Sequence, residues 1–593
     1  MKLYLQRNRK TWLILNAFLV YGWMTVLSPL SVTDTYYSVY VLCALVGLLC
    51  LCDNFRYGRR EPEQGRGLLL FFSGLFSLAV QLSNYALFEP LHVVQNLFEA
   101  ALGFCGGFSI GYQILLCMCR RLPFASLIPS AIYPVRFFCL SFFSISVIDL
   151  VYLFFVQYPG ILTTDSFSTI AQIVKTSMFN NTMPFWHTVT VMPFYRLGVF
   201  LFGDANGGVA LFHCAQILFL SACFSYSLVT MYQGGAPRPM LVIAYGLYSL
   251  MPYNIVYSVT LWKDIPFAGA VLLFVTAFCR ILRQIGKKER ANYVLLSCGA
   301  LGMALWRTNG WVAFLVTVIV LFLFLRKQYK RVLTLLAALL AFTWVLLNPV
   351  LDLLGVSPTN LVEAFAVPMQ QVARVVANGR DLTAEEESLL SDIFWIDRMA
   401  ELYDPQTVDP IKFETFRYDQ VDVIKENPGN YLELYFSLGV RYPGDYLKAW
   451  IEETKGYWNG GYFFWIYTLE LGENDFGIVH TGGDSFAAKL YAALFRYVEK
   501  LTVLQPLMSI GLHVWVLTAC CVICIVKKRR EGFLCVPLLV LILGLILGTP
   551  VYSEFRYAYP LIITLPLILF ATVFATDVPS KDPICGNEFF NAI

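Results

Sequence analysis

The sequence predicts an all-α protein that crosses a membrane many times, and three observations lead to this fold class. Hydrophobic residues make up 58% of the 593 residues and charged residues 14%, against roughly 25% charged residues in soluble domains. Apolar runs of about 20 residues, the length that a helix needs to cross the hydrocarbon core, recur along the chain. Basic residues gather in alternate connections between these runs. The composition therefore excludes a soluble nucleic-acid-binding protein, a disordered chain and a secreted disulfide scaffold.

The apolar runs predict about fourteen transmembrane helices. The first run follows a basic start, but its length of about 20 residues and the lack of a small-residue cleavage site favour a retained span over a signal peptide. The predicted spans are 11–31, 37–52, 67–88, 94–118, 137–157, 207–231, 239–257, 265–282, 292–307, 311–325, 332–351, 502–526, 533–550 and 557–576.

The loop charges predict the orientation of these spans, because Lys and Arg are retained on the cytoplasmic side. Basic clusters such as Arg59-Arg60, Arg120-Arg121 and Lys527-Lys528 fall in every second connection. Both termini are then expected to be cytoplasmic. The segments expected outside are 158–206, 258–264, 308–310, 352–500 and 551–556.

Span positions and charge divide the chain into four predicted parts. Residues 1–136 hold accessory transmembrane helices, and residues 137–351 form a transmembrane core that includes the exterior loop 158–206. Residues 352–500 carry 24 acidic and 12 basic residues and are predicted to be an exterior helical domain. Residues 501–593 hold the last spans and a cytoplasmic tail.

The two long exterior segments are predicted to be helical. In the exterior loop, Thr164 or Asp165 can cap a first helix. The mixed polar and apolar residues of Phe185–Phe202 suit a second helix that lies in the membrane interface. In the exterior domain, the pattern predicts helices over Asn360–Asn378 and Thr383–Glu401.

An aromatic run late in the exterior domain has two interpretations. It is either an interfacial belt where the domain meets the bilayer or a set of stacking faces for a sugar acceptor, and both can hold together. The run consists of Trp450, Tyr457, Trp458, Tyr462, Phe463, Phe464, Trp465 and Tyr467.

Four cations in or next to the expected exterior segments are singled out as departures from the positive-inside pattern. They are Arg196, Lys263, Arg307 and Arg556. Exterior cations close to the hydrocarbon suit a phosphate or pyrophosphate head group. The acidic residues Asp165, Asp264 and Glu554 are expected to line the same crevice. The alternative is that Lys263 with Asp264, and Glu554 with Arg556, form local ion pairs at helix ends that contribute little.

Five short motifs occur in a characteristic order along about residues 140–575. They are Tyr158-Pro-Gly…Thr164-Asp-Ser166, Leu261-Trp-Lys-Asp264, Arg307-Thr-Asn-Gly310, Pro368-Met-Gln-Gln…Ala373-Arg374 and Glu554-Phe-Arg-Tyr557. This order resembles the GT-C superfamily of membrane glycosyltransferases and, more closely, a family of bacterial multi-pass proteins related to those enzymes. The resemblance implies a GT-C-like fold in a bacterial plasma membrane.

The resemblance also implies an activity, which is the inverting transfer of a sugar from a polyprenyl-phosphate donor to an exterior glycan, lipid or protein acceptor of the cell envelope. Asp165 matches the loop acid that acts as a general base or binds a metal, so a divalent metal ion is left open as a cofactor. The chain has Ser166 in place of the usual second acid, and no metal ligands are assigned. Many relatives carry His-Pro where this chain has Met183-Pro184, so His187 is the second catalytic candidate.

The roles of the remaining residues follow from the chemistry of such a donor. Nucleotide sugars do not reach the exterior face, so a transferase there needs a lipid-borne donor, cations for its phosphate and a carboxylate for the attacking hydroxyl. Lys263, Arg307 and Arg556 are predicted to bind the donor phosphate. The supporting residues are Asp264, Glu554 and Arg196.

Two other functions remain open at the level of sequence. A transporter or flippase of a glycolipid or polysaccharide is expected to show internal repeats, interrupted helices near the midplane and charges deep within spans, and few of these are evident. A non-enzymatic scaffold for envelope assembly is the third possibility.

Overall fold

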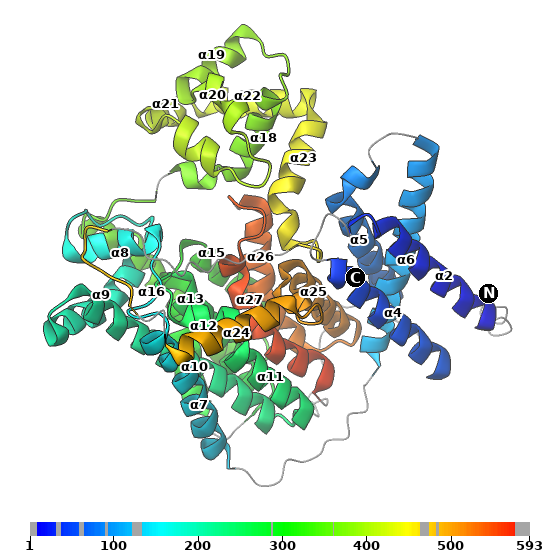
Figure 1. Ribbon diagram of the computed structural model, residues 1–593, viewed down its shortest axis with the longest axis horizontal. Helices are drawn as coiled ribbons and strands as arrows, with labels where there is room; N and C mark the ends of the chain where they lie inside the picture. The colour runs from blue at the N-terminus through cyan, green and yellow to red at the C-terminus, as the bar shows by residue number, and fades with distance from the viewer. Residues whose placement is uncertain are drawn as a thin grey trace.

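The computed structural model is a helical bundle with a smaller helical domain above it (Figure 1). Within the described residues the chain forms α-helices, short 3₁₀ and π turns and isolated β-bridges. The predicted all-α class is therefore confirmed. The described residues are 9–30, 37–57, 65–88, 93–120, 133–285, 289–359, 361–462, 474–481, 485–548 and 550–575.

Eleven of the described helices are long and apolar enough to cross a membrane, so the protein is a multi-pass membrane protein. Each of the fourteen predicted runs overlaps a helix, but three do not meet this criterion as single helices. One is a pair, α11 (Arg238–Leu250) and α12 (Pro252–Ser258), bent by 47°. The others, α14 (Glu289–Leu305) and α25 (Ile510–Val526), have 17 residues each. Seventeen residues rise about 26 Å, less than a hydrocarbon core of about 30 Å.

The remaining predicted spans coincide with longer helices or helix pairs. They are α2 (Arg9–Leu27), α4 (Tyr37–Tyr57), α5 (Arg66–Ser83), α6 (Val93–Cys119), α7 (Pro134–Phe155), α10 (Ala205–Gln233), α13 (Asp264–Leu282), α15 (Thr308–Leu325), α16 (Lys330–Leu347) with α17 (Pro349–Leu353), η7 (Arg530–Cys535) with α26 (Val536–Gly548), and α27 (Phe555–Leu569) with η8 (Phe570–Phe574).

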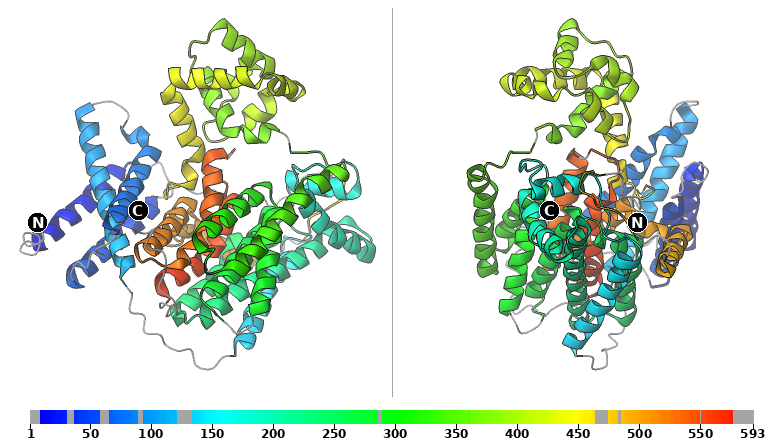
Figure 2. Two further views of the ribbon diagram at one scale, coloured as in Figure 1. Left: turned by 180° about the vertical axis from the view of Figure 1, so that it is seen from behind. Right: turned by 60° about the vertical axis from the view of Figure 1, so that its left-hand side comes forward.

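The first four helices, α2, α4, α5 and α6, form a group of their own beside the main bundle (Figure 2). This group contacts the main bundle through α25. The rings of Phe72 and Phe76 lie 5.4 and 5.3 Å from that of Trp515. The hydroxyl of Tyr40 donates a hydrogen bond of 2.7 Å to the side chain of Asn459. The accessory helices therefore have both an apolar and a polar contact with the core.

Helix α13 lies at the centre of the main bundle and is almost entirely buried between α10, α14 and α27. Gly299 of α14 permits the closest of these contacts, because a Cβ there would lie 2.5 Å from the backbone nitrogen of Phe274. Helices α13 and α27 begin at the same end of the bundle, as the contacts of Lys263 and Arg556 with one carboxylate show. The polar residues that precede both helices are thereby brought to one face.

The exterior loop contains the two predicted helices, α8 (Thr164–Val174) and α9 (Phe185–Phe202). One detail of the prediction is wrong, since the first helix is capped by Thr163 and not by Thr164 or Asp165. The backbone N–H of Thr163 donates to the hydroxyl of Ser166 at 3.0 Å, as in a capping box. Asp165 is consequently inside the first turn, where a carboxylate also interacts well with the helix dipole.

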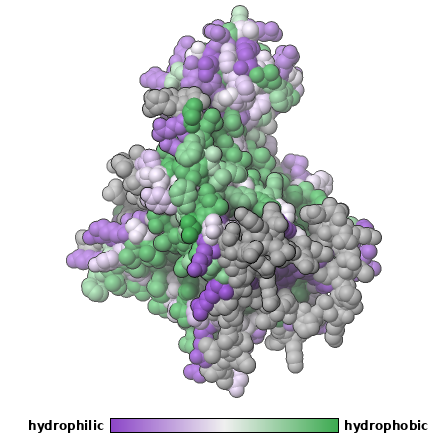
Figure 3. Space-filling model, turned by 90° about the vertical axis from the view of Figure 1, so that its right-hand side faces the viewer, coloured by the Kyte–Doolittle hydropathy of each residue, from purple (hydrophilic) through white to green (hydrophobic). Residues whose placement is uncertain are grey.

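The exterior domain has its own hydrophobic core, and Figure 3 shows polar side chains over it and apolar side chains over the bundle below. Its helices are α18 (Ala366–Ala377), α19 (Ala384–Ile393), α20 (Ile396–Leu402), α21 (Val421–Glu426), α22 (Pro428–Arg441) and α23 (Pro443–Thr454). The helix predicted over Thr383–Glu401 is two helices, because the extended Phe394 pairs with Phe416. The domain is followed by η5 (Lys455–Tyr457) and, further on, by α24 (Phe486–Lys500), which packs on α7.

For Tyr457 and Trp458, both interpretations of the aromatic run are wrong. Tyr457 and Trp458 are buried, so they face neither lipid nor a sugar. The indole of Trp458 stacks on that of Trp450 at 5.8 Å, and Trp450 donates to the carbonyl of Ile546. These rings pack the domain onto the spans. Residues 463–467 of the run lie outside the described residues.

The exterior domain and η5 together hold the loop that precedes α27. On one side, the N–H of Val408 donates to the carbonyl of Pro550 at 3.1 Å, and the N–H of Tyr552 donates to the carbonyl of Gln406 at 3.0 Å. On the other side, the hydroxyl of Tyr457 accepts from the N–H of Glu554 at 2.9 Å. The loop is thereby held between the exterior domain and η5, directly before Arg556.

We expect Gly456→Ala to disturb this contact, because a Cβ there would lie 2.1 Å from the Cβ of Ser553 and 2.2 Å from the carbonyl oxygen of Tyr552. Overpacking of this kind costs about 1–3 kcal/mol, and thermal unfolding in detergent should show a lower midpoint. The matched control is Gly444→Ala in α23, where nothing lies within 4 Å. Equal midpoints for the two variants would mean that the loop adjusts freely.

Candidate functional site

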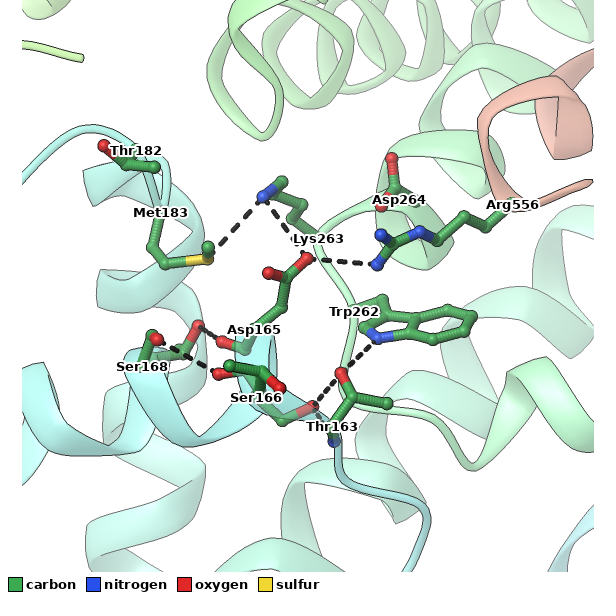
Figure 4. A network of polar contacts seen from close by, with 12 residues as sticks. Thr163, Asp165, Ser166, Ser168, Thr182, Met183, Trp262, Lys263, Asp264 and Arg556 are labelled. Carbon is green, nitrogen blue, oxygen red and sulfur yellow. Dashed lines mark hydrogen bonds and ion pairs between the residues drawn. The ribbon is translucent and has the colours of Figure 1, made fainter. Parts of the chain in front are cut away.

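The candidate site is built around the first turn of α8, which is fastened to the segment between α12 and α13. The N–H of Ile161 donates to the carbonyl of Val259 at 2.7 Å, and the N–H of Leu261 donates back to Ile161 at 3.1 Å. The indole N–H of Trp262 donates to the hydroxyl of Thr163 at 2.7 Å. These bonds place Asp165 against the residues that open α13 (Figure 4).

Asp165 contacts two cations from different elements. One carboxylate oxygen lies 3.0 Å from a guanidinium nitrogen of Arg556 and 3.7 Å from the ammonium of Lys263. Arg556 also lies 3.6 Å from Glu554. Arg307 forms a separate ion pair with Asp264 at 2.9 Å. The site therefore combines three cations with three carboxylates at the end of the bundle that faces the exterior domain.

Aromatic rings cover the faces of both guanidinium groups. Arg556 lies 4.6 Å from the ring centre of Trp262 and 5.1 Å from that of Tyr557. Arg307 lies 4.6 Å from the same Tyr557 ring and 5.8 Å from that of Phe267. Stacking uses the face of a guanidinium and leaves its N–H edge for anions. The two arginines are therefore held in one orientation, with their donors available to oxygen ligands.

The carboxyl groups differ in how easily they ionise. Burial raises the pKa of Asp165, but Lys263 and Arg556 lower it by more, so the pKa lies below its usual value. For Glu554, burial and the nearby Asp264 and Asp165 outweigh Arg556, and the pKa is raised. In the resting site Asp165 is therefore the firmly ionised group, and as such it is a weak base.

His187 lies behind Lys263. It is buried, and neither ring nitrogen has a hydrogen-bond partner among the described residues. Burial first, and then the ammonium of Lys263, lower the pKa of His187 to about 3. Lys263 also contacts the sulfur of Met183 at 3.6 Å (Figure 4). His187 is thus a neutral imidazole next to the site, and Met183 occupies the position beside the ammonium.

Six predicted residues come together in this cluster: Asp165, Lys263, Asp264, Arg307, Glu554 and Arg556. Arg196, which was predicted to support them, does not lie in this cluster. Its guanidinium donates to the carbonyl of Ile173, near the far end of α8, about 12 Å along that helix from Asp165. Its location in α9 points it at this helix end, where a cation is favourable.

Sequence reasoning missed the residues that organise the cluster. Trp262 and Tyr557 each directly neighbour a predicted cation within a motif. That position could have indicated their role beside the cations. Asp409, from the exterior domain, is close enough to Arg556 and Asp165 for each to affect its pKa. Asp409 lies among other acidic residues of the exterior domain, so the sequence did not indicate that it lies near the site. Within the described ranges, no three His, Cys, Asp or Glu side chains gather as ligands for a metal ion.

An apolar groove runs between α11, α12 and α27, with a volume of about 310 Å³. It extends from Pro237 and Phe574 at one end of these helices to Tyr253 and Asn254 at the other. The ring of Tyr253 lies 5.1 Å from that of Phe555, the residue before Arg556. The charged residues of the cluster do not themselves line the groove.

Comparison with known proteins identifies a family. A protein-family profile described as "Family of unknown function (DUF6020)" matches residues 174–582. The matched stretch contains Lys263, Arg307 and Arg556, whereas Asp165 precedes it. No curated protein and no solved structure matches the chain.

The ion pairs of Asp165 predict an acid-dependent loss of stability. Because the pKa of Asp165 in the folded state is lowered, the pairs stabilise the protein above the ordinary carboxyl pKa of about 3.9 and are lost as the pH falls through the lowered value. Asp165→Asn should cost about 1–2 kcal/mol at pH 7, since the cations lose a partly buried partner. The difference from the wild type should shrink below about pH 4.

Scanning fluorimetry in detergent between pH 7 and pH 3 measures this difference. Asp422→Asn is the control, because Asp422 pairs with Lys425 on the surface, where both side chains are exposed. A gap between wild type and Asp165→Asn that stays constant across this range would exclude a stabilising role for the ionised carboxylate.

Proposed function

The chain belongs to the DUF6020 family, whose profile covers more than half of its length, and from its site we propose that it is a GT-C-like membrane glycosyltransferase. It transfers a sugar from a polyprenyl-phosphate donor to an acceptor of the cell envelope on the exterior face. The observation that carries the proposal is the cluster of stacked cations and carboxylates, on a bundle that also holds an apolar groove between its spans. Such a pairing of charge and apolar surface matches a phosphate attached to a long lipid.

The donor phosphate is bound by Arg556, Arg307 and Lys263. Each of these cations now contacts a protein carboxylate. A phosphate can offer two oxygens to an Arg fork, as a carboxylate can, so it can take the place of Asp165 at Arg556. The tail lies in the groove between α11 and α27, whose walls are apolar side chains of the spans.

This exchange also activates the base. The pKa of Asp165 is lowered by Lys263 and Arg556, so its pKa rises when both cations turn to the phosphate. Asp165 then accepts the proton of an acceptor hydroxyl. The hydroxyl oxygen attacks the anomeric carbon, and the bond from that carbon to the phosphate oxygen breaks. The polyprenyl phosphate leaves with the bonding electrons and stays paired with the arginines.

A transporter or flippase of a glycolipid is the second candidate, and one observation favours it. The span of α11 and α12 is bent by 47° and lines the groove, and interrupted helices are typical of transport sites. The two functions differ in their product, since a flippase moves an intact lipid and a transferase cleaves it.

The proposal requires α8, α9 and the exterior domain to lie outside a bacterial plasma membrane, with both termini in the cytoplasm. Ser177 and Ser388 are exposed, the first after α8 and the second in α19. In a background without native cysteines, Cys at either position should react with an impermeant maleimide in intact cells. Protection of both sites in intact cells, with labelling after lysis, would reverse the orientation and exclude an exterior reaction.

Transfer itself is tested in proteoliposomes with radiolabelled polyprenyl-phosphate sugars. The wild type should release polyprenyl phosphate, whereas a flippase should only make the intact lipid accessible on the other side. Asp165→Asn should lower turnover by roughly 10²–10⁴, because Asn cannot take a proton. Because Thr163 caps α8, helix capping does not account for such a loss.

The control for the transfer assay is Asp397→Asn, an exposed carboxylate in α20, which should retain full turnover. Near-normal transfer by purified Asp165→Asn would move the base to Asp264, Glu554 or the exterior domain. Movement of intact donor with no release of polyprenyl phosphate would favour the flippase.

A further inference from the structure

The exterior domain forms a second wall beside the cluster of Asp165 and Arg556. Backbone hydrogen bonds of Gln406 and Val408 with Tyr552 and Pro550 hold this wall in place. Asp409 follows Val408 directly, and Arg556 follows Tyr552 by four residues. A carboxylate of the exterior domain is therefore held next to the site by backbone hydrogen bonds.

The carboxylate of Asp409 has no hydrogen-bond or ion-pair partner among the described residues, although its backbone N–H donates to the hydroxyl of Thr407. The nearest candidate partner is engaged elsewhere, because Lys412 pairs with Glu363 at 2.5 Å and its side chain is 6% exposed. Burial raises the pKa of Asp409, Lys412 and Arg556 lower it, and Glu363 and Asp165 raise it. Asp409 is thus half-buried and has no ion-pair partner among the described residues, and the charges of Arg556 and Asp165 act on it.

A second carboxyl group lies behind Asp409. Glu453, in the last turn of α23, is completely buried, and neither of its oxygens has a partner among the described residues. Burial, and then Asp409, raise the pKa of Glu453 to about 9. A buried polar group without a partner is costly. Within the described part of the chain, Asp409 is the charged group that affects the pKa of Glu453.

An aromatic face completes this wall. Tyr418 is 40% exposed, and Glu363 and Asp409 are the charged groups that affect its pKa. Carboxyl groups that can accept hydrogen bonds from several hydroxyls, next to an accessible ring, suit a sugar or polyol. Because Glu363 is paired with Lys412, the unpaired negative charge of this wall is that of Asp409, and it disfavours an anionic ligand at this position.

We propose that Asp409 binds the acceptor, and that the acceptor is an uncharged polyhydroxylated molecule, a sugar chain or polyol, at the attacking end. Asp409 accepts hydrogen bonds from hydroxyls of this molecule, and Tyr418 provides a stacking face. This inference rests on the proposed function, because it names the substrate that receives the sugar.

Binding is measured without any donor, by saturation-transfer NMR on the full-length protein in nanodiscs. The neutral probes are maltotriose, cellotriose and chitotriose, and the anionic probe is trigalacturonate. The wild type should bind at least one neutral probe and bind trigalacturonate at least tenfold more weakly. Asp409→Ala should weaken the neutral probe roughly 10- to 100-fold, and Asp409→Asn should reduce the discrimination against trigalacturonate. Asp397→Ala, at an exposed carboxylate of the same domain, should change neither.

Three results would overturn the inference: no binding of any probe by the wild type, equal binding of neutral and anionic probes, or unchanged affinity in Asp409→Ala. Folding of the variants is checked by their unfolding midpoints, and Asp409→Asn preserves the size of the side chain. Because these measurements need no transfer, binding of a neutral probe by a protein that releases no polyprenyl phosphate would count against the proposed function alone.

Discussion

The carboxylate of Asp165 is the interaction on which the rest of the site depends. It comes from the exterior loop, Lys263 from the segment before α13, and Arg556 from the first turn of α27. One carboxylate therefore joins three parts of the chain that lie up to 391 residues apart. These contacts are affordable near the membrane surface because the charges balance and because indole and phenol rings cover the guanidinium faces.

The balance of charge explains how the site can be stable and still respond to a ligand. Each cation has a carboxylate within 4 Å, so none is left uncompensated in the empty protein. An incoming anion exchanges one oxygen ligand for another, and the stacked rings keep the N–H edges in place. In the proposed function, the displaced carboxylate regains ordinary basicity, and binding and reactivity are then coupled through a single residue, Asp165.

Much of this arrangement could be predicted from local sequence, and the remainder depends on tertiary contacts. Loop charge singled out Lys263, Arg307 and Arg556. The positive-inside rule does not explain cations on the predicted exterior side, so these residues were expected to have a function. The same criterion also selected Arg196, which does not lie in the cluster. Loop charge does not show which side of α9 a residue faces. Thr163, Thr164 and Asp165 are all residue types that cap helices well. The residue that caps α8 is Thr163, whose hydroxyl also accepts a hydrogen bond from the indole of Trp262, 99 residues away.

The loop Pro550–Tyr552 has a consequence for how the two walls of the site move. It pairs with the exterior domain at Gln406 and Val408, and it leads within four residues to Arg556. The exterior domain and Arg556 are therefore connected through one short piece of backbone. A displacement of this domain relative to the bundle would therefore strain the backbone that carries Arg556.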